Sequence, residues 1–326
     1  MNDGRARRTS SAMALDMKIP AGADSATIEV DGRKLGLTNL NKVFWPKLGL
    51  TKRDLLQYYA DVAPFVLPHI RGKAMVMKRY PNGIAGDFFF MKRAPSSTPE
   101  WIETCAIEHR SGNVINFPMA QDTSSLLWLI NLGCIDLNPW YGRCESFDRP
   151  EYLHFDLDPQ QAPFETVREA ALIVHDALRT LGMTVFPKTS GSKGMHLYVG
   201  IKTGPVQHDV WAFAKRVAFE LAKAHSDILT AEYKIEKRPR GRVLIDYNQN
   251  RLGATLASIY SVRPTPEASV STPVTWDEVE RGIQTADFTV RNVPERVAKL
   301  GDLWAPLTQK KGRFDLAQLL RGVANA

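Results

Sequence analysis

The sequence predicts an α+β fold with a central, mostly antiparallel sheet flanked by helices. Residues 164–182 and 208–226 carry apolar side chains at the spacing of amphipathic helices. Between them, residues 183–201 consist of two apolar strands joined by a short glycine-rich turn, which is the pattern of an antiparallel hairpin. The sequence shows no internal repeat and no low-complexity linker. These observations favour one α+β domain over two independent ones.

We expect this domain to carry a short tail at each end. Residues 1–24 are predicted to form a flexible basic tail, residues 25–310 the domain, and residues 311–326 a C-terminal tail. Within the domain, we expect an N-terminal lobe at about residues 25–150 and a second lobe at about residues 151–265, followed by a C-terminal extension.

The first elements follow from local signals. Residues 26–46 are predicted to form two strands joined by a turn at residues 31–32, which are Asp and Gly. Residues 51–70 are predicted to be helical, because Thr51 is a suitable N-cap and Asp54 follows three residues later.

Three further elements complete the N-terminal half. Residues 74–83 read as a strand that ends in a Pro-Asn-Gly turn, and an aromatic run follows at residues 86–95. Residues 123–133 are predicted to form a helix that ends at Gly133.

The C-terminal half begins with a strand at residues 151–159, ahead of the helices and the hairpin described above. Residues 240–249 contain another apolar strand. Residues 263–273 are rich in Pro, Ser and Thr and are expected to be extended, and residues 275–282 are expected to form a short helix.

The composition restricts the class of protein. Lysine and arginine number 42 against 35 acidic residues, a formal charge of +7, which is the sign expected of a protein that binds polyphosphate or nucleic acid. The three cysteines, Cys105, Cys134 and Cys144, show no CxxC spacing, so we expect neither a disulfide nor a zinc site. The sequence shows no signal peptide and no run of roughly 20 apolar residues. We therefore expect a soluble cytoplasmic protein without a membrane partner.

Two acids at the end of the strand at residues 151–159 point to metal chemistry. Asp156 and Asp158 lie two residues apart, so their side chains point to the same face and repel each other. A divalent cation relieves this repulsion, and carboxylate oxygens suit Mg²⁺ or Mn²⁺, which also bridge substrate phosphates. Asp246, at the end of a second apolar strand, is compatible with a third ligand. The alternative is a solvated strand end that leads into the turn at Pro159.

The turn at residues 190–194, SGSKG, has the composition of a phosphate-binding turn. Its backbone amides and the Ser190 hydroxyl are suited to phosphate oxygens, and Lys193 adds a positive charge. The turn leads into a strand that carries His196 rather than into a helix, so it is not a Walker P-loop. An ordinary hairpin with an exposed lysine is the alternative. Beside an acidic pair, the combination favours a nucleoside triphosphate.

Two other segments are suited to nucleic acid. Residues 234–242 concentrate basic side chains immediately before Asp246, although such a run is also typical of a solvated loop. Residues 88–90 are three consecutive phenylalanines, which cannot all face the core of a strand, so we expect at least one to be exposed. An exposed ring beside Lys92 and Arg93 is suited to stacking on a base, and a partly buried strand is the alternative.

Three motifs, in this order, resemble the signature motifs of the archaeo-eukaryotic primase superfamily. They are FDLDP at residues 155–159, KTSGSKGMHLYV at 188–199 and GRVLIDYNQN at 241–250. The sequence is most similar to the polymerase domain of bacterial DNA ligase D, the end-joining primase-polymerase. Further blocks such as TNLNKVFWP, FFFMKRAP and STPVTWDEV extend the resemblance from about Leu37 to Trp304.

The resemblance implies a primase-type core and a role for each matched residue. It implies two metal ions, Mn²⁺ or Mg²⁺, held by the catalytic acids Asp156, Asp158 and Asp246. The positions that match nucleotide-binding residues are Lys78, Asn138, Ser190, Lys193, His196, Arg240, Gln249 and Arg263. The positions that match DNA-binding residues are Asn39, Lys42 and Lys52, near a 5′-phosphate, and Phe89 and Phe90, against the template.

Two departures from the family pattern leave specificity open. Asn138 stands where many relatives carry a histidine associated with the nucleotide sugar, so the preference for rNTP or dNTP is open. In the segment KRPRGR, either Arg238 or Arg240 matches the contact to the triphosphate.

The implied function is DNA-dependent addition of rNTP or dNTP to a primer 3′-hydroxyl, at breaks or short gaps with a 5′-phosphate. End joining and gap filling are both compatible, and Ku and a separate ATP-dependent DNA ligase are the implied partners at the bacterial nucleoid. Because the sequence shows no ligase signature, we expect a stand-alone polymerase. The alternatives are a primase that makes short RNA primers, a catalytically silent DNA-end-binding scaffold and, from the residues alone, a metal-dependent nuclease or nucleotidase.

Overall fold

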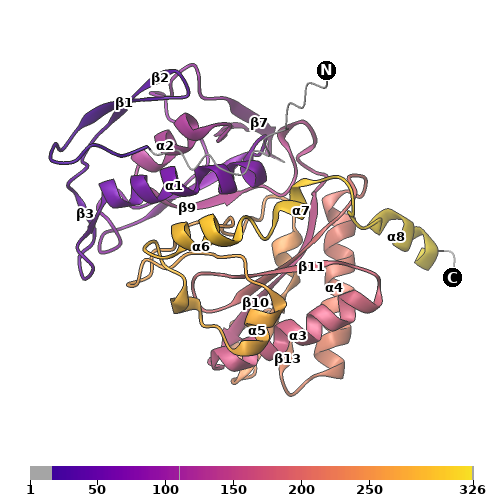
Figure 1. Cartoon of the computed structure of the whole chain (residues 1–326). Coiled ribbons are helices and arrows are strands. Elements are labelled where there is room, and N and C mark those ends of the chain that lie inside the picture. Colours follow the sequence, from indigo (N-terminus) through magenta and orange to yellow (C-terminus); the bar gives the residue numbers. More distant parts are fainter. Residues whose placement is uncertain (1–16, 110, 325–326) are drawn as a thin grey trace, which may run out of the picture.

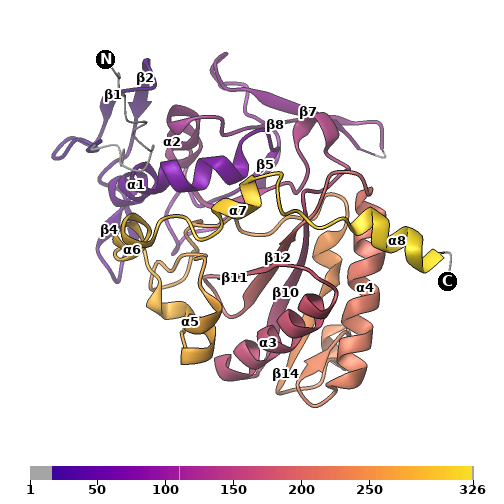
Figure 2. The same ribbon diagram turned by 45° about the vertical axis from the view of Figure 1, so that its right-hand side comes forward.

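The computed structural model describes residues 17–109 and 111–324, and its largest sheet has five strands (Figures 1 and 2). Across the sheet these are β11 (Val185–Thr189), β12 (Met195–Gly200), β10 (Tyr152–Gln160), β14 (Arg242–Asp246) and β13 (Leu229–Thr230). β13 runs parallel to β14, and the other pairings are antiparallel. The predicted α+β class with a mostly antiparallel sheet is confirmed. The predicted N-terminal tail lies largely outside the described residues.

Two amphipathic helices pack against this sheet, α3 (Phe164–Thr180) and α4 (Gln207–Ala224) (Figure 2). α3 buries Val167, Ala171 and Val174, at the spacing that the sequence pattern predicts. Their apolar stripes leave the other face of the sheet available to polar side chains.

The N-terminal half is built on a three-stranded antiparallel sheet in the order β6 (Phe89–Met91), β5 (Met75–Arg79) and β9 (Cys134–Pro139). Helix α1 (Lys52–Ile70) starts with the predicted capping box, in which Thr51 and Asp54 exchange hydrogen bonds with each other's backbone amides. α1 packs on α2 (Thr123–Asn131), the second predicted helix.

Shorter elements surround these two halves. Three hairpins lie in the N-terminal half: β1 (Ala26–Val30) with β2 (Arg33–Leu37), β3 (Val43–Trp45) with β4 (Leu50–Thr51), and β7 (Thr104–Glu108) with β8 (Val114–Pro118). The last helices are α5 (Trp276–Arg281), α6 (Val293–Leu300), α7 (Ala305–Thr308) and α8 (Leu316–Ala324). Among the residues described, no helix is both long and apolar enough to cross a membrane.

One irregular stretch, residues 257–273, contacts both halves, and we call it the linking segment. On one side, the Tyr58 hydroxyl of α1 donates to the carbonyl of Tyr260 at 2.8 Å. On the other side, the Thr189 amide of β11 donates to the carbonyl of Thr272 at 2.9 Å. The segment therefore connects helix α1 of the N-terminal half with β11 of the five-stranded sheet.

The expectation that the cysteines form no disulfide is wrong. Cys105 of β7 and Cys144 are joined by a disulfide, with their Cα atoms 5.7 Å apart, whereas Cys134 is buried and free. The bonded pair is 39 residues apart in sequence, and Cys144 packs against the small buried cluster that contains Cys105, Phe117 and Trp140. Cysteine spacing carries no signal for such a contact.

Candidate active site

Strand register places one row of polar side chains across the five-stranded sheet. Lys188 of β11 is opposite His196 of β12, His196 is opposite Asp156 of β10, and Asp156 is opposite Asp246 of β14. Residues directly opposite each other point to the same face, and so does Asp158, two residues beyond Asp156. A strongly polar row therefore crosses four strands.

The three predicted metal ligands converge at one end of this row. Asp156, Asp158 and Asp246 each offer a carboxylate oxygen, and the three oxygens lie within 4.8 Å of one another. Asp156 and Asp246 are buried, and Asp158 is half-buried. The structure thus brings the predicted acids together, in an all-oxygen arrangement that fits Mg²⁺ or Mn²⁺.

The electrostatics of this cluster show how strongly the acids perturb one another. Burial, followed by the charge of Asp246, raises the pKa of Asp156 to about 7. The charge of Asp156, followed by burial, raises the pKa of Asp158 to about 7. Burial also raises the pKa of Asp246. Concentrated negative charge of this kind favours a bound cation.

The turn between β11 and β12 is organised by Ser190. The Ser190 hydroxyl accepts hydrogen bonds from the backbone amides of Ser192, at 3.1 Å, and Gly194, at 3.0 Å. A Cβ atom at Gly194 would lie 2.1 Å from the carbonyl oxygen of Leu157, so the close approach of the turn to β10 requires glycine there. Lys193 is exposed at the tip of the turn.

A cavity of about 420 Å³ connects the acids with the turn. Its volume is in the range of small-molecule sites in proteins. Nine of the predicted site residues line it: Lys78, Phe90, Asn138, Asp156, Asp158, Ser190, Lys193, His196 and Arg263. The structure therefore unites most of the predicted nucleotide-binding set around one space.

The other two predicted nucleotide-binding residues lie beside Asp246 or in the basic loop. Gln249 donates from its amide to the Asp246 carboxylate at 3.1 Å. Arg240 is exposed, whereas Arg238 is half-buried and its charge lowers the pKa of both Asp158 and Asp246. Of the two arginines, Arg238 is therefore better placed to act on the acid cluster.

The predicted 5′-phosphate group also gathers in one place. Lys42 donates its backbone amide to the Asn39 carbonyl at 3.1 Å, and Lys52 donates its own to the Lys42 carbonyl at 2.8 Å. Lys52 is only 4% exposed, and its ammonium donates to the Thr38 carbonyl. Burial, followed by the charge of Lys42, lowers the pKa of Lys52 to about 8. Within the part of the chain that the structure describes, Lys52 forms no ion pair, and the charge of Asp24 offsets that of Lys42 and Arg79 only in part.

The phenylalanine run confirms the prediction of an exposed ring. Phe88, Phe89 and Phe90 are 49%, 46% and 59% exposed. The ammonium of Lys78 lies 4.0 Å from the centre of the Phe88 ring, and Phe90 borders the cavity. An aromatic and basic surface therefore adjoins the nucleotide cavity.

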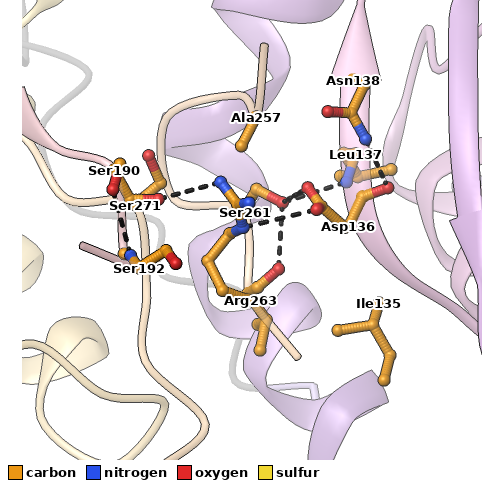
Figure 3. A network of polar contacts seen from close by, with 12 residues as sticks. Ile135, Asp136, Leu137, Asn138, Ser190, Ser192, Ala257, Ser261, Arg263 and Ser271 are labelled. Carbon is orange, nitrogen blue, oxygen red and sulfur yellow. Dashed lines mark hydrogen bonds and ion pairs between the residues drawn. The ribbon is translucent and has the colours of Figure 1, made fainter. Parts of the chain in front are cut away.

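A buried acid that the sequence reasoning missed joins the cavity wall to the turn (Figure 3). Asp136 of β9 is 2% exposed, and its carboxylate lies 3.3 Å from Nε of Arg263. Arg263 in turn donates from Nη1 to the Ser190 carbonyl at 2.9 Å, and the Ser261 hydroxyl donates to Asp136 at 3.3 Å. Alternation along β9 was the available signal, because Asp136 lies two residues before Asn138.

Comparison with known proteins agrees with this geometry. A family model described as "LigD, primase-polymerase domain" matches residues 51–304. The "Multifunctional non-homologous end joining protein LigD" of Mycolicibacterium smegmatis is 34% identical over 284 residues, covering 84% of this chain and 36% of the relative. The "Bifunctional non-homologous end joining protein LigD" of Bacillus subtilis is 30% identical over 273 residues, covering 82% of this chain and 43% of the relative. The chain thus spans less than half the length of these relatives.

A solved structure extends the likeness to three dimensions. It is the polymerase domain from Mycobacterium tuberculosis Ligase D in complex with DNA, with a TM-score of 0.79 and 32% sequence identity. The match covers 83% of this chain and 97% of that domain. The resemblance inferred from the three motifs is confirmed. The chain belongs to the LigD primase-polymerase domain family, a family of nucleotidyltransferases.

Proposed function

We propose that this chain adds rNTP or dNTP to a primer 3′-hydroxyl at DNA breaks or short gaps that carry a 5′-phosphate. One observation carries the proposal: of three convergent carboxylates, those of Asp156 and Asp158 line a cavity of about 420 Å³ that is also lined by Lys78, Lys193 and Arg263. Acids for cations and bases for phosphates are both needed to hold a metal-bound triphosphate.

The acids and bases have separate tasks in this reaction. When bound by Asp156, Asp158 and Asp246, two divalent cations would activate the primer hydroxyl and offset the charge of the leaving pyrophosphate. Lys193 and Arg263 would balance charge on the phosphates while the primer 3′-oxygen bonds to the α-phosphorus and the bond to pyrophosphate breaks. Phosphoryl-group transfer asks for little covalent chemistry from the protein, so positioning dominates.

The DNA contacts follow from two surfaces outside the cavity. Exposed Phe89 and Phe90 supply rings against which a template base can stack. Asn39, Lys42 and Lys52 would bind the 5′-phosphate on the far side of a gap, where the buried positive charge of Lys52 favours an anion.

The pathway is inferred from the relatives. Those that the chain matches are named as non-homologous end joining proteins, and the similar solved domain is in complex with DNA. We therefore propose a role in end joining with Ku and an ATP-dependent DNA ligase, with short-gap filling as a related task.

The test is nucleotide addition to a DNA gap with a 5′-phosphate. The assay compares rNTP with dNTP and Mn²⁺ with Mg²⁺, in the unmodified chain, Asp158→Ala and Asn138→His. We expect templated, metal-dependent addition that Asp158→Ala abolishes, and a changed rNTP/dNTP ratio in Asn138→His.

Two outcomes would contradict the proposal. Tight gap binding without any addition would favour the silent scaffold. Synthesis that starts on an unprimed template as efficiently as on a gap would favour the primase.

A further inference from the structure

Lys188 is a buried, basic side chain that the proposed chemistry leaves without a task. It is 0% exposed, lies on β11 and does not line the nucleotide cavity. Its Nζ lies 2.8 Å from Nδ1 of His196 and 2.9 Å from the carbonyl oxygen of Ala257, and it also contacts the hydroxyl oxygen of Ser271. Three contacts match the three N–H groups of an ammonium.

Two of these partners can only accept from Lys188. The carbonyl of Ala257 has no hydrogen to donate. The hydroxyl of Ser271 donates its single hydrogen to the Thr189 carbonyl at 3.0 Å, so toward Lys188 it is an acceptor. When Lys188 is an ammonium, its third N–H faces Nδ1 of His196, which then accepts.

An accepting Nδ1 decides the state of the other ring nitrogen. In a neutral imidazole one nitrogen carries the hydrogen and the other accepts, so the hydrogen lies on Nε2. Nε2 is 3.3 Å from a carboxylate oxygen of Asp156, and His196 lines the nucleotide cavity. This contact lacks hydrogen-bond geometry, because that Asp156 oxygen has no hydrogen-bond partner among the described residues. The hydrogen on Nε2 therefore stays available to a ligand in the cavity.

The charges around Lys188 act in both directions. Burial, followed by the charge of Arg263, lowers its pKa well below the ordinary value, whereas the carboxylates of Asp156 and Asp136 raise it. The three acceptors supply the hydrogen bonds that an ammonium needs when water is excluded.

We propose that Lys188 is a positioning residue that fixes the His196 ring with Nε2 as a donor to a phosphate oxygen of the incoming nucleoside triphosphate. This inference rests on the proposed function, because it assumes that the cavity binds a nucleotide. It also assigns His196 a role: a ring nitrogen that carries hydrogen offers no lone pair to a cation, so His196 is not a metal ligand although it adjoins Asp156.

The tautomer is measured directly by NMR. The full chain is labelled with ¹⁵N-histidine, Mg²⁺ is added, and long-range ¹H–¹⁵N correlations are recorded, with His196 assigned from its absence in His196→Gln. We expect the pattern of an Nε2–H imidazole. An Nδ1–H pattern, or a ring that averages between the two tautomers, would overturn the proposal. This measurement needs no variant of Lys188.

A double-mutant cycle tests whether Lys188 acts through His196. Equilibrium binding of ATP with Mg²⁺ is measured for the unmodified chain, Lys188→Met, His196→Gln and the double variant, each checked for folding by thermal unfolding. We expect Lys188→Met to weaken binding about tenfold in the unmodified chain and less than about twofold in the His196→Gln background. Equal losses in both backgrounds would show a general structural role and overturn the inference.

The cycle also separates this inference from the proposed function. If the unmodified chain binds no ATP, or if His196→Gln binds it unchanged, the nucleotide site itself is wrong. If His196→Gln weakens binding and Lys188→Met is additive with it, the site stands and only the role of Lys188 falls.

Discussion

Strand β10 follows a buried acid, Glu151, and three further acids cluster near its other end. The pKa values of the acids shift in opposite directions at the two ends. At the start, the Glu151 carboxylate lies 3.0 Å from Lys73, 3.1 Å from Arg143 and 3.3 Å from Arg313. Burial alone would raise its pKa, but the charges of Lys73, Arg143 and Arg313 outweigh burial and lower it to about 2. At the other end, the pKa values of Asp156 and Asp158 are raised to about 7.

This difference distinguishes a carboxylate that stabilises the fold from carboxylates that are suited to binding a cation. Basic side chains of the protein neutralise Glu151, so its electrostatic interactions act within the native structure. The carboxylates of Asp156 and Asp158 repel each other, so they are at their most stable when a cation binds. A buried carboxylate can thus be assigned a structural or a binding role according to whether basic side chains already neutralise it.

We expect the strongest effect from a substitution in the acid cluster at the end of β10. Asp158→Ala should reduce nucleotide addition by at least about a thousandfold, because removal of a residue that acts directly in catalysis has effects of this size. DNA binding should change less than about twofold, since the carboxylate does not attract DNA. Steady-state addition and gap binding measure the two quantities, with the exposed Asp227→Ala as the matched control. A parallel loss of DNA binding would mean that Asp158 supports the fold.

Glu151→Gln should disrupt the ion pairs before β10, and we expect it to lower stability while leaving nucleotide addition nearly unchanged. Removing one partner of a buried ion-pair group costs about 3 kcal/mol of unfolding free energy, because the remaining charges stay buried. Urea unfolding measures the loss, and the exposed Glu145→Gln is the matched control. The folded fraction should keep its addition rate within about threefold. A stable but inactive Glu151→Gln variant would mean that Glu151 takes part in the reaction, and its purely structural role would be wrong.

The pH dependence of metal stabilisation sharpens the comparison. For Asp156 and Asp158 the folded pKa lies above the ordinary value of 3.8, so their contribution to stability is full below about pH 4 and is lost as pH rises to about 7. Mg²⁺ binds only the ionised carboxylates and replaces this lost stability. The increase in Tm on adding Mg²⁺ should therefore grow between about pH 5 and pH 8. Equal increments across this range, or the same growth in Asp158→Asn, would contradict it.

The smallest effect extends the comparison to positive charge. Lys52 is a buried cation that forms no ion pair with an acid of the described residues, although the charge of Asp24 acts on it. By the same reasoning, we expect it to bind an anion. Changing Lys42 and Lys52 together to Gln should lower the preference for a 5′-phosphorylated gap by about tenfold. Binding to gaps with and without the phosphate measures this preference, and changing the exposed Lys34 and Lys47 in the same way is the control. Equal weakening on both DNAs would remove the 5′-phosphate assignment.

Sequence reasoning reached the part of the site that local patterns encode. Asp156 and Asp158 were readable from the two-residue alternation of a strand, and the resemblance placed Asp246 beside them. Asp136 and Lys188 were missed because their surroundings depend on the linking segment, which supplies Ser261, Arg263 and Ser271. The bond between Cys105 and Cys144 was missed because it too joins residues far apart in the sequence. What local sequence does not encode is the set of contacts made between distant parts of the chain.

The linking segment also sets the order in which the site is completed during synthesis. Arg263 contacts Ser190, 73 residues earlier in the chain, and Ser261 contacts Asp136, 125 residues earlier. A growing chain can pair β10 with β12 before residues 257–273 have left the ribosome, but it cannot yet close the wall between the two halves. Contacts over such separations form late because loop closure opposes them. We therefore expect a nascent chain to fold its acidic strands first and to acquire a nucleotide pocket only when this short segment arrives.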